Sequence, residues 1–144
     1  MLRAAIIGAT GVVGQQFVVA LQRHPWFKLT VLAASERSAG KSYKDALTSA
    51  RGQFQWYCDE ACEPDVLNMP VLEASQLDGT EADIFFSGLE TDAARELEPK
   101  YARHAAVIST TSSTCRNCDS SSEIECTVKV SRCDFDSIEY NSIL

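Results

Sequence analysis

Short apolar runs alternate with polar breaks through the first hundred residues. Residues 2–7 form a short apolar strand that leads directly into a glycine-rich turn. The next apolar residues recur at the spacing of one helix face: Val13, Phe17, Ala20 and Leu21. His24-Pro25 ends this helix, because the residue before a proline avoids the α conformation. Residues 28–34 form a continuous apolar strand, typical of a parallel sheet that is covered on both faces.

Strands and helices continue to alternate beyond this second strand. Ser42 is expected to cap a short helix that ends near Ala50, and residues 51–65 are predicted to be irregular. One or two short strands are expected in residues 66–72, around Pro70.

The last third of this pattern is strand, helix, strand. Residues 83–87 and 105–109 predict two further strands. Between them, Thr91 is expected to cap a helix that is kinked at Pro99. The apolar residues of this helix share one face: Ala94, Leu97 and Tyr101. The alternation predicts an α/β fold, namely a Rossmann-like, doubly wound and mostly parallel sheet with right-handed crossovers.

The pattern changes after residue 109. Residues 109–122 contain nine Ser or Thr in fourteen positions, and four of the six cysteines follow residue 114. We therefore expect two parts, a domain of residues 1–109 and a divergent, Ser/Thr/Cys-rich tail of residues 110–144 that is irregular and disordered. Alternating apolar residues allow one edge strand within the tail: Ile124, Cys126, Val128 and Val130.

Composition and charge narrow the class of protein. The 144 residues suffice for one domain, and no apolar run approaches the roughly 20 residues of a membrane span. The net charge of −7, from 13 basic and 20 acidic residues, argues against nucleic acid as a partner. A strand that begins near residue 3 leaves no room for a targeting segment, so the expected location is the cytoplasm.

The glycine turn carries the clearest chemistry. Gly8, Gly11 and Gly14 lie between the first strand and the first helix, where a doubly wound domain holds the pyrophosphate of a dinucleotide. Glycine lets the backbone approach phosphate oxygens without a Cβ in the way, and the helix N-terminus offers unpaired N–H groups. The G-x-x-G-x-x-G spacing is one residue longer than the commonest fingerprint. A glycine-rich turn that binds no ligand is the alternative.

The end of the second strand bears on the choice of cofactor. In this fold it meets the adenine ribose, where an arginine accommodates a 2′-phosphate and an acidic residue favours NAD. Arg37 stands between the hydroxyls of Ser35 and Ser38, a set that suits phosphate and favours NADP. Glu36 leaves NAD open, and a polar surface loop that binds nothing is the other interpretation.

Five motifs occur in an order that resembles a known family. They are Gly8-Ala9-Thr10-Gly11-Val12-Val13-Gly14-Gln15, His24-Pro25-Trp26-Phe27, Ala34-Ser35-Glu36-Arg37-Ser38-Ala39-Gly40-Lys41, Phe86-Ser87-Gly88-Leu89 and Val107-Ile108-Ser109. Together they resemble the N-terminal, NADP-binding domain of aspartate-semialdehyde dehydrogenase of the fungal and archaeal type. The sister family of N-acetyl-glutamyl-phosphate reductases is an alternative, but it usually has a tyrosine at the position of Val12.

The resemblance implies an activity and a cofactor site. The family reduces aspartyl phosphate to aspartate semialdehyde with NADPH and releases phosphate, a step of lysine, threonine and methionine biosynthesis. Residues that match the family motifs would contact NADP(H). The pyrophosphate set is Gly8, Thr10, Gly11, Val12, Val13 and Gly14. Ser35, Arg37 and Ser38 would hold the 2′-phosphate, and Ser87, Gly88 and Leu89 would lie along the cofactor.

The resemblance stops at Thr110, where the family has an asparagine. In the family a second domain follows, which carries the nucleophilic cysteine, the catalytic histidine and the interface of the homo-oligomer. We therefore assign no catalytic residue to this chain and expect it to be inactive alone. The break also suggests a truncated or frame-shifted product. A non-catalytic nucleotide-binding or regulatory role remains an alternative.

Cysteines and histidines offer other chemistry. The tail has four thiols, Cys115, Cys118, Cys126 and Cys133, of which the first two match a zinc knuckle and the second two are poorly spaced. We expect these thiols to be incidental and assign no metal site, and we interpret Cys58 and Cys62 in the same way. His24 and His104 each follow a helix end, where a partner of the helix dipole is a more common role than catalysis.

Overall fold

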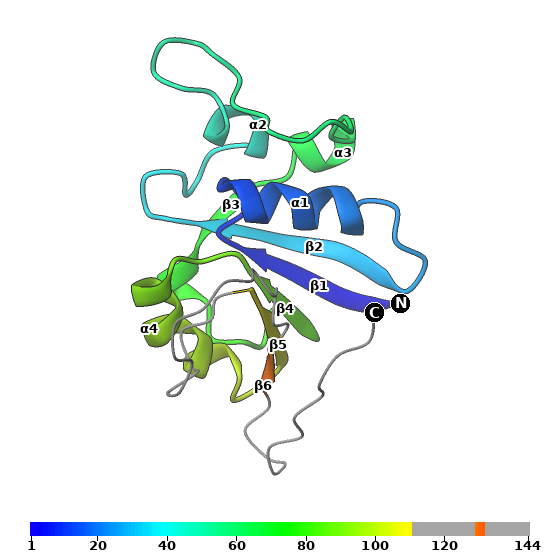
Figure 1. The fold of residues 1–144 in the computed structure, drawn as a ribbon, viewed down its shortest axis with the longest axis vertical. Coiled ribbons are helices and arrows are strands. Elements are labelled where there is room, and N and C mark those ends of the chain that lie inside the picture. The colour runs from blue at the N-terminus through cyan, green and yellow to red at the C-terminus, as the bar shows by residue number, and fades with distance from the viewer. Residues whose placement is uncertain (111–128, 132–144) are drawn as a thin grey trace, which may run out of the picture.

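A six-stranded sheet runs through the part of the chain that this computed structural model describes, residues 1–110 and 129–131 (Figure 1). Its strands are β1 (Leu2–Ile7), β2 (Phe27–Ala34), β3 (Val71–Glu73), β4 (Ile84–Ser87), β5 (Ala106–Ser109) and β6 (Lys129–Ser131). Their order across the sheet is β3-β2-β1-β4-β5-β6. All neighbours are parallel except β6, which lies antiparallel to β5 at the edge. The predicted Rossmann-like, doubly wound sheet is confirmed.

The sheet order reverses between β1 and β4. From β1 the chain moves outward to β2 and β3, then returns to the other side of β1 and moves outward again. The carboxyl ends of β1 and β4 therefore flank the switch point, where ligands of open α/β sheets bind.

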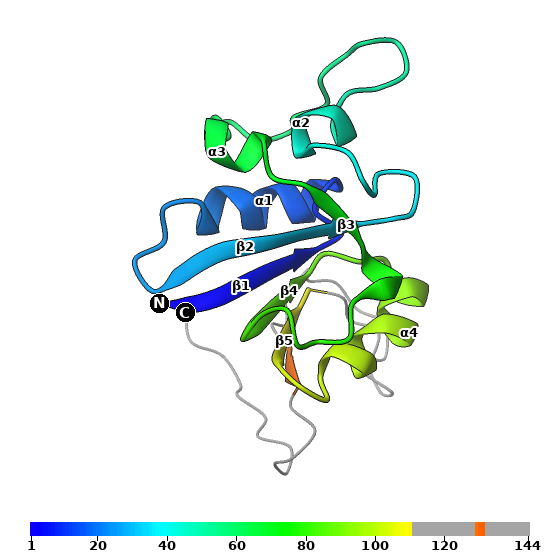
Figure 2. The same cartoon turned by 180° about the vertical axis from the view of Figure 1, so that it is seen from behind.

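Helices cover both faces of the sheet. They are α1 (Val12–Leu21), α2 (Tyr43–Ala46), α3 (Pro64–Leu67), the 3₁₀ turn η1 (Ala74–Gln76) and α4 (Thr91–Tyr101). Figures 1 and 2 show α1, α2 and α3 on one side and α4 on the other. Alternate residues of β1 face the two layers, because Ala4 and Ile6 pack under α1 while Ala5 and Ile7 pack toward α4. This double burial explains the continuous apolar run in the sequence.

The predicted face of the first helix is right at Phe17 and Leu21, which pack in the core, and wrong at Val13 and Ala20. The structure buries Gly14, Gln15, Val18 and Leu21 of α1. Val13 is 40% exposed, and Ala20 is exposed as well. The helix turns the side without a Cβ at Gly14 toward the end of β1, because the backbone there is too close for any larger residue. Close packing of the backbone overrides the apolar periodicity.

Three other expectations need correction or detail. Ser42 caps α2 as predicted, with its Oγ accepting a hydrogen bond from the Asp45 N–H at 3.2 Å, but the helix ends at Ala46. Residues 66–72 hold the end of α3 and most of β3 rather than only strands, since Pro64 favours a helix start. Glu90 is the N-cap of α4 instead of Thr91, with no side-chain cap bond.

Helix α4 continues past Pro99 to Tyr101. The predicted edge strand is confirmed at Val130, which lies in β6; its other three residues, like the rest of the tail after Thr110, lie outside the described residues. Within the described ranges, none of the helices has both the length and the apolar character that crossing a bilayer requires.

Candidate functional site: a glycine cradle at the switch point

Three glycines bring three backbone segments together at the carboxyl edge of the sheet. A Cβ on Gly14 would lie 2.1 Å from the Gly8 carbonyl oxygen, and one on Gly8 would lie 2.9 Å from the Gly88 carbonyl oxygen. Gly8 also has a φ of +77°, in the left-handed region that favours glycine. The end of β1, the start of α1 and the loop after β4 can meet only because none of the three residues has a side chain. We call residues 8–14 the glycine loop.

Gly11 has a different role in the same loop. Its φ is −77°, and a Cβ there would meet only the Gly8 carbonyl oxygen, at 3.4 Å. Neither the backbone conformation nor the local packing requires glycine at this position. A backbone without a Cβ here leaves room on the outer side of the loop, where an anion approaches a helix N-terminus.

The N-terminal end of α1 presents unpaired N–H groups. Within the described part of the chain, no acceptor contacts the N–H groups of Thr10, Val12, Val13 and Gly14. The first intrahelical bond runs from the Gln15 N–H to the Gly11 carbonyl at 2.9 Å. Unpaired N–H groups at a helix end, with its partial positive charge, have the chemistry that anions require.

Two buried side chains that the sequence did not single out hold the glycine loop. The Tyr43 hydroxyl donates to the Ala9 carbonyl at 2.7 Å, and Nε2 of Gln15 donates to the Thr10 carbonyl at 3.1 Å. Both side chains are fully buried, and burial raises the pKa of Tyr43, so its hydroxyl stays protonated. No periodicity distinguishes these residues. A glutamine directly after the third glycine was the one available signal.

The loop after β2 lies at the same edge. Ala33, near the end of β2, accepts the N–H groups of Gly8 and Ala9 at 2.9 and 3.0 Å. Residues 35–39 then form one tight turn, in which the Ser38 N–H donates to the Ser35 carbonyl at 2.9 Å. The structure thus brings the turn that holds Ser35, Arg37 and Ser38 to the same edge as the glycine loop, as the sequence predicts.

Arg37 is exposed and its guanidinium has no acidic partner among the described residues. Arg3 and Arg23, by contrast, form ion pairs with Asp83 and Glu63. A free arginine beside two serine hydroxyls retains its full capacity for a phosphate.

Ser87, at the end of β4, is fully buried, and its Oγ has no hydrogen-bond partner in the described structure. It pairs in register with Ile7 of β1, and the following Gly88 N–H donates to the Ile7 carbonyl at 2.8 Å. Leu89 is half-buried against the α4 layer. The three residues therefore adjoin the glycine loop, and the Ser87 hydroxyl has unused bonding capacity there.

Replacing Ser87 by alanine should not destabilise the ligand-free chain. The substitution removes an unsatisfied buried hydroxyl, which costs about 1–3 kcal/mol when it is left unpaired. Urea unfolding would measure the effect, with Ser109→Ala as the matched control, because the Ser109 Oγ donates to Glu98 at 2.7 Å. A larger loss for Ser87→Ala than for Ser109→Ala would contradict this account.

Thr110 stands where the resemblance expects an asparagine. It follows the last residue of β5, and its N–H and Oγ1 both donate to the Ser87 carbonyl, at 3.4 and 3.5 Å. The Thr110 side chain thus lies beside Ser87 at the same edge of the sheet as the glycine loop.

Among the described residues, no three or more His, Cys, Asp or Glu side chains come together as a metal site would require. His24 and His104 follow the ends of α1 and α4, and the His24 ring packs against Phe27 with centroids 4.8 Å apart. Burial raises the pKa of both described thiols, Cys58 and Cys62, which disfavours the reactive thiolate. The four tail cysteines lie outside the described residues.

Cys62 should make stability depend on pH in the alkaline range. Burial first, then Glu63 and Cys58, raises its pKa from 9.0 to about 11. The folded state therefore holds this proton more tightly than the unfolded state, so its stabilising effect is complete below pH 9 and is lost as the pH rises to about 11. Urea unfolding from pH 8 upward would show a steeper fall for the wild type than for Cys62→Ala. Equal slopes would contradict the assignment.

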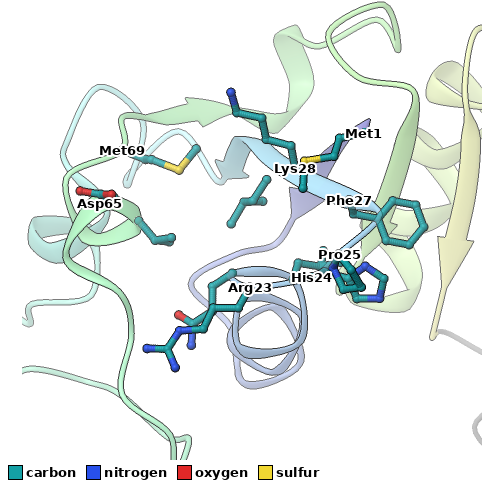
Figure 3. Close-up of a pocket in the computed structure, with 12 residues that line it drawn as sticks. Met1, Arg23, His24, Pro25, Phe27, Lys28, Asp65 and Met69 are labelled. Atoms are coloured by element: carbon teal, nitrogen blue, oxygen red, sulfur yellow. The ribbon is translucent and has the colours of Figure 1, made fainter.

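A surface cavity of about 510 Å³ lies at the opposite end of α1 (Figure 3). It is lined by residues from the end of α1, the start of β2 and α3, among them Arg23, Phe27, Lys28 and Asp65. Because α1 separates it from the glycine loop by about 15 Å of helix length, it is a separate feature. Binding of a ligand in this cavity can therefore be distinguished from binding at the glycine loop.

The fold and the glycine loop at the switch point together define a dinucleotide-binding domain of the Rossmann type. A family model described as "Semialdehyde dehydrogenase, NAD binding domain" matches residues 3–133. The chain belongs to this family.

Proteins that are similar to the chain in sequence carry names that fit this family. The chain is 42% identical over 112 residues to an aspartate-semialdehyde dehydrogenase of Methanothermobacter thermautotrophicus, covering 78% of the chain and 30% of that protein. For the enzyme of that name in Schizosaccharomyces pombe the identity is 40% over 99 residues, which cover 69% of the chain and 26% of that protein. The chain thus spans 30% and 26% of the length of these two relatives.

A solved structure shares the fold and carries the cofactor. The crystal structure of aspartate semialdehyde dehydrogenase with NADP from Candida albicans superposes with a TM-score of 0.70 at 36% identity, covering 81% of this chain and 31% of that one. Both the resemblance drawn from the five motifs and its restriction to the nucleotide-binding domain are confirmed.

Proposed function

We propose that this chain binds NADP(H) as the cofactor domain of an aspartate-semialdehyde dehydrogenase. One observation carries the proposal: the N–H groups of Thr10, Val12, Val13 and Gly14 have no acceptor among the described residues, and they lie at the edge of the sheet where Gly8, Gly14 and Gly88 meet. Such a set suits a pyrophosphate and has no evident structural use. The NADP in the similar Candida albicans structure supports the choice of ligand.

The proposed contacts follow from this geometry. The backbone of Gly8, Thr10, Gly11, Val12, Val13 and Gly14 would hold the pyrophosphate. The exposed Arg37, with Ser35 and Ser38, would hold the 2′-phosphate and so favour NADP over NAD. Ser87, Gly88 and Leu89 would lie along the rest of the cofactor, and the unpaired Ser87 hydroxyl is free to take part.

Bound NADPH supplies a hydride, which in this class of enzyme reduces the acyl group derived from aspartyl phosphate. The residues described here bind and orient, and none of them is placed to act as a nucleophile or an acid. We therefore infer that the chain alone does not catalyse the reaction. The resemblance places the required cysteine, histidine and basic residues in the second domain, outside the part of the relatives that this chain matches. A phosphate-dependent oxidation of the semialdehyde by the purified chain would contradict this inference.

Calorimetric titration tests the proposed cofactor. NADP⁺ is expected to bind the 144-residue chain with one site and at least about 10-fold lower Kd than NAD⁺, because only NADP⁺ offers the 2′-phosphate to Arg37. Absence of binding would overturn the proposal, and a preference for NAD⁺ would overturn its specificity.

Other features of the proposal rest on the same resemblance. We propose a dinucleotide-binding domain of residues 1–109, followed by the divergent tail of residues 110–144. A cytoplasmic location fits a biosynthetic activity of this class. The resemblance attributes homo-oligomerisation of the family to the second domain. A nucleotide-binding role without catalysis is the second candidate. The close packing of Gly8, Gly14 and Gly88 at the switch point supports it, as does the lack of a metal-ligating cluster among the described residues.

A further inference from the structure

The carbonyl groups of residues 8–11, the first part of the glycine loop, each accept a hydrogen bond. The Gly8 and Gly11 carbonyls accept the N–H groups of Gly11 and Gln15 at 3.0 and 2.9 Å. The two carbonyls between them accept from side chains, Ala9 from the Tyr43 hydroxyl and Thr10 from Gln15. Figures 1 and 2 both place α2, which begins with Tyr43, over the N-terminal end of α1.

Gln15 uses its whole side-chain amide to join two segments. Nε2 donates to the Thr10 carbonyl at 3.1 Å and to the Gln55 carbonyl at 3.0 Å. Oε1 accepts from the Tyr57 N–H at 2.8 Å. The side chain is fully buried, so these bonds are shielded from water and each would be costly to lose. Gln15 thus connects the glycine loop to residues 55–57, about forty positions along the chain.

The orientation of the Thr10 carbonyl matters for an anion. A peptide unit places its N–H and its C=O on opposite sides, and the N–H opposite the Thr10 carbonyl is that of Gly11, which donates to the Gly8 carbonyl at 3.0 Å. The bond from Gln15 to the Thr10 carbonyl therefore fixes the peptide unit that comes immediately before α1. A carbonyl released from Gln15 could turn toward the phosphate and repel it. Donors that are fixed before the ligand arrives need no reorganisation when it binds.

We propose that Gln15 is a positioning residue for the pyrophosphate. Its amide holds the Thr10 carbonyl, fixes the Thr10–Gly11 peptide unit from which α1 begins, and links this part of the glycine loop to residues 55–57. Tyr43 does the same for the Ala9 carbonyl. This inference rests on the proposed function, because it specifies how the same site is kept ready for NADP(H).

The test separates the pyrophosphate from the 2′-phosphate. In the full chain, Gln15→Met is expected to raise the Kd for NADP⁺ by about 10-fold or more, the scale of a lost buried hydrogen bond. The Kd for 2′-AMP, which has the 2′-phosphate but no pyrophosphate, should stay within about twofold. Gln15→Glu keeps the size of the side chain but cannot donate to the Thr10 carbonyl, and the same split is expected. Gln16→Met is the matched control, since Gln16 is exposed.

Two outcomes would overturn the inference while leaving the proposed function intact. They are unchanged NADP⁺ binding in both Gln15 variants, or an equal loss for NADP⁺ and 2′-AMP, which would mean a general structural role. Failure of the wild-type chain to bind NADP⁺ would overturn the proposed function itself. If neither Gln15 variant folds, Tyr43→Phe replaces them, and it must show the same split between the two ligands.

A second measurement needs no ligand. In Gln15→Met, amide hydrogen exchange should speed up at Tyr57, whose N–H loses its acceptor, and in the glycine loop as well. Faster exchange at Tyr57 alone would contradict the proposed link between the two segments.

Discussion

Gly14→Ala is expected to destabilise the chain by more than about 3 kcal/mol and to abolish NADP⁺ binding. The new Cβ would lie 2.1 Å from the Gly8 carbonyl oxygen and 2.7 Å from the Ala9 Cα. Both atoms belong to backbone at the end of β1, so the clash cannot be relieved by turning a side chain. A domain of this size has about 5–15 kcal/mol of stability, and the predicted loss is a large part of it.

Gly11→Ala is the matched control for this substitution. Its Cβ would approach no atom closer than 3.4 Å, and its φ of −77° suits alanine. The variant should change the free energy of unfolding by no more than about 1 kcal/mol, the cost of alanine at an N-cap. NADP⁺ binding should still weaken, because the added methyl group lies at the N-terminus of α1, where the pyrophosphate is proposed to bind. Urea unfolding and calorimetry of both variants measure the two effects. Equal stability of Gly14→Ala and wild type would contradict the close backbone packing described at Gly14.

Arg37→Ala is expected to raise the Kd for NADP⁺ by about 100-fold while the Kd for NAD⁺ changes by no more than about twofold. Only NADP⁺ carries the 2′-phosphate that a guanidinium binds through charge-assisted hydrogen bonds. Thermal stability should not change, because Arg37 is exposed and has no ion pair among the described residues.

Titration of both cofactors into the variant checks this prediction. Arg51→Ala is the control, since Arg51 is also exposed and the substitution removes the same charge. An equal loss for NADP⁺ and NAD⁺ would place Arg37 at a shared part of the cofactor. No loss for either would remove it from the site.

Much of the site could be predicted because its chemistry is local in sequence. The strand of residues 2–7, the glycine turn and the helix after it are adjacent, and the turn after β2 follows from the fold class. Glycine spacing and one arginine between two serines were therefore enough to locate both loops. The family followed from motifs in register along the chain.

The supports of the site could not be predicted, because their contacts are distant in sequence or depend on backbone packing. Tyr43 contacts Ala9, and Gln15 contacts Gln55 and Tyr57, and none of these pairs follows a periodic pattern. The helix face was wrong at Val13 and Ala20, because an absent Cβ at Gly14 decides which side of α1 meets the sheet. Close backbone contacts of this kind have no signature in an apolar pattern.

Backbone amide NMR of the ¹⁵N-labelled chain, with and without NADP⁺, tests the central claim most directly. The account predicts the largest shifts at Val12, Val13 and Gly14, whose N–H groups have no acceptor among the described residues, and a second set at residues 35–38. No shifts, or shifts confined to the cavity at the other end of α1 around Arg23 and Lys28, would contradict it.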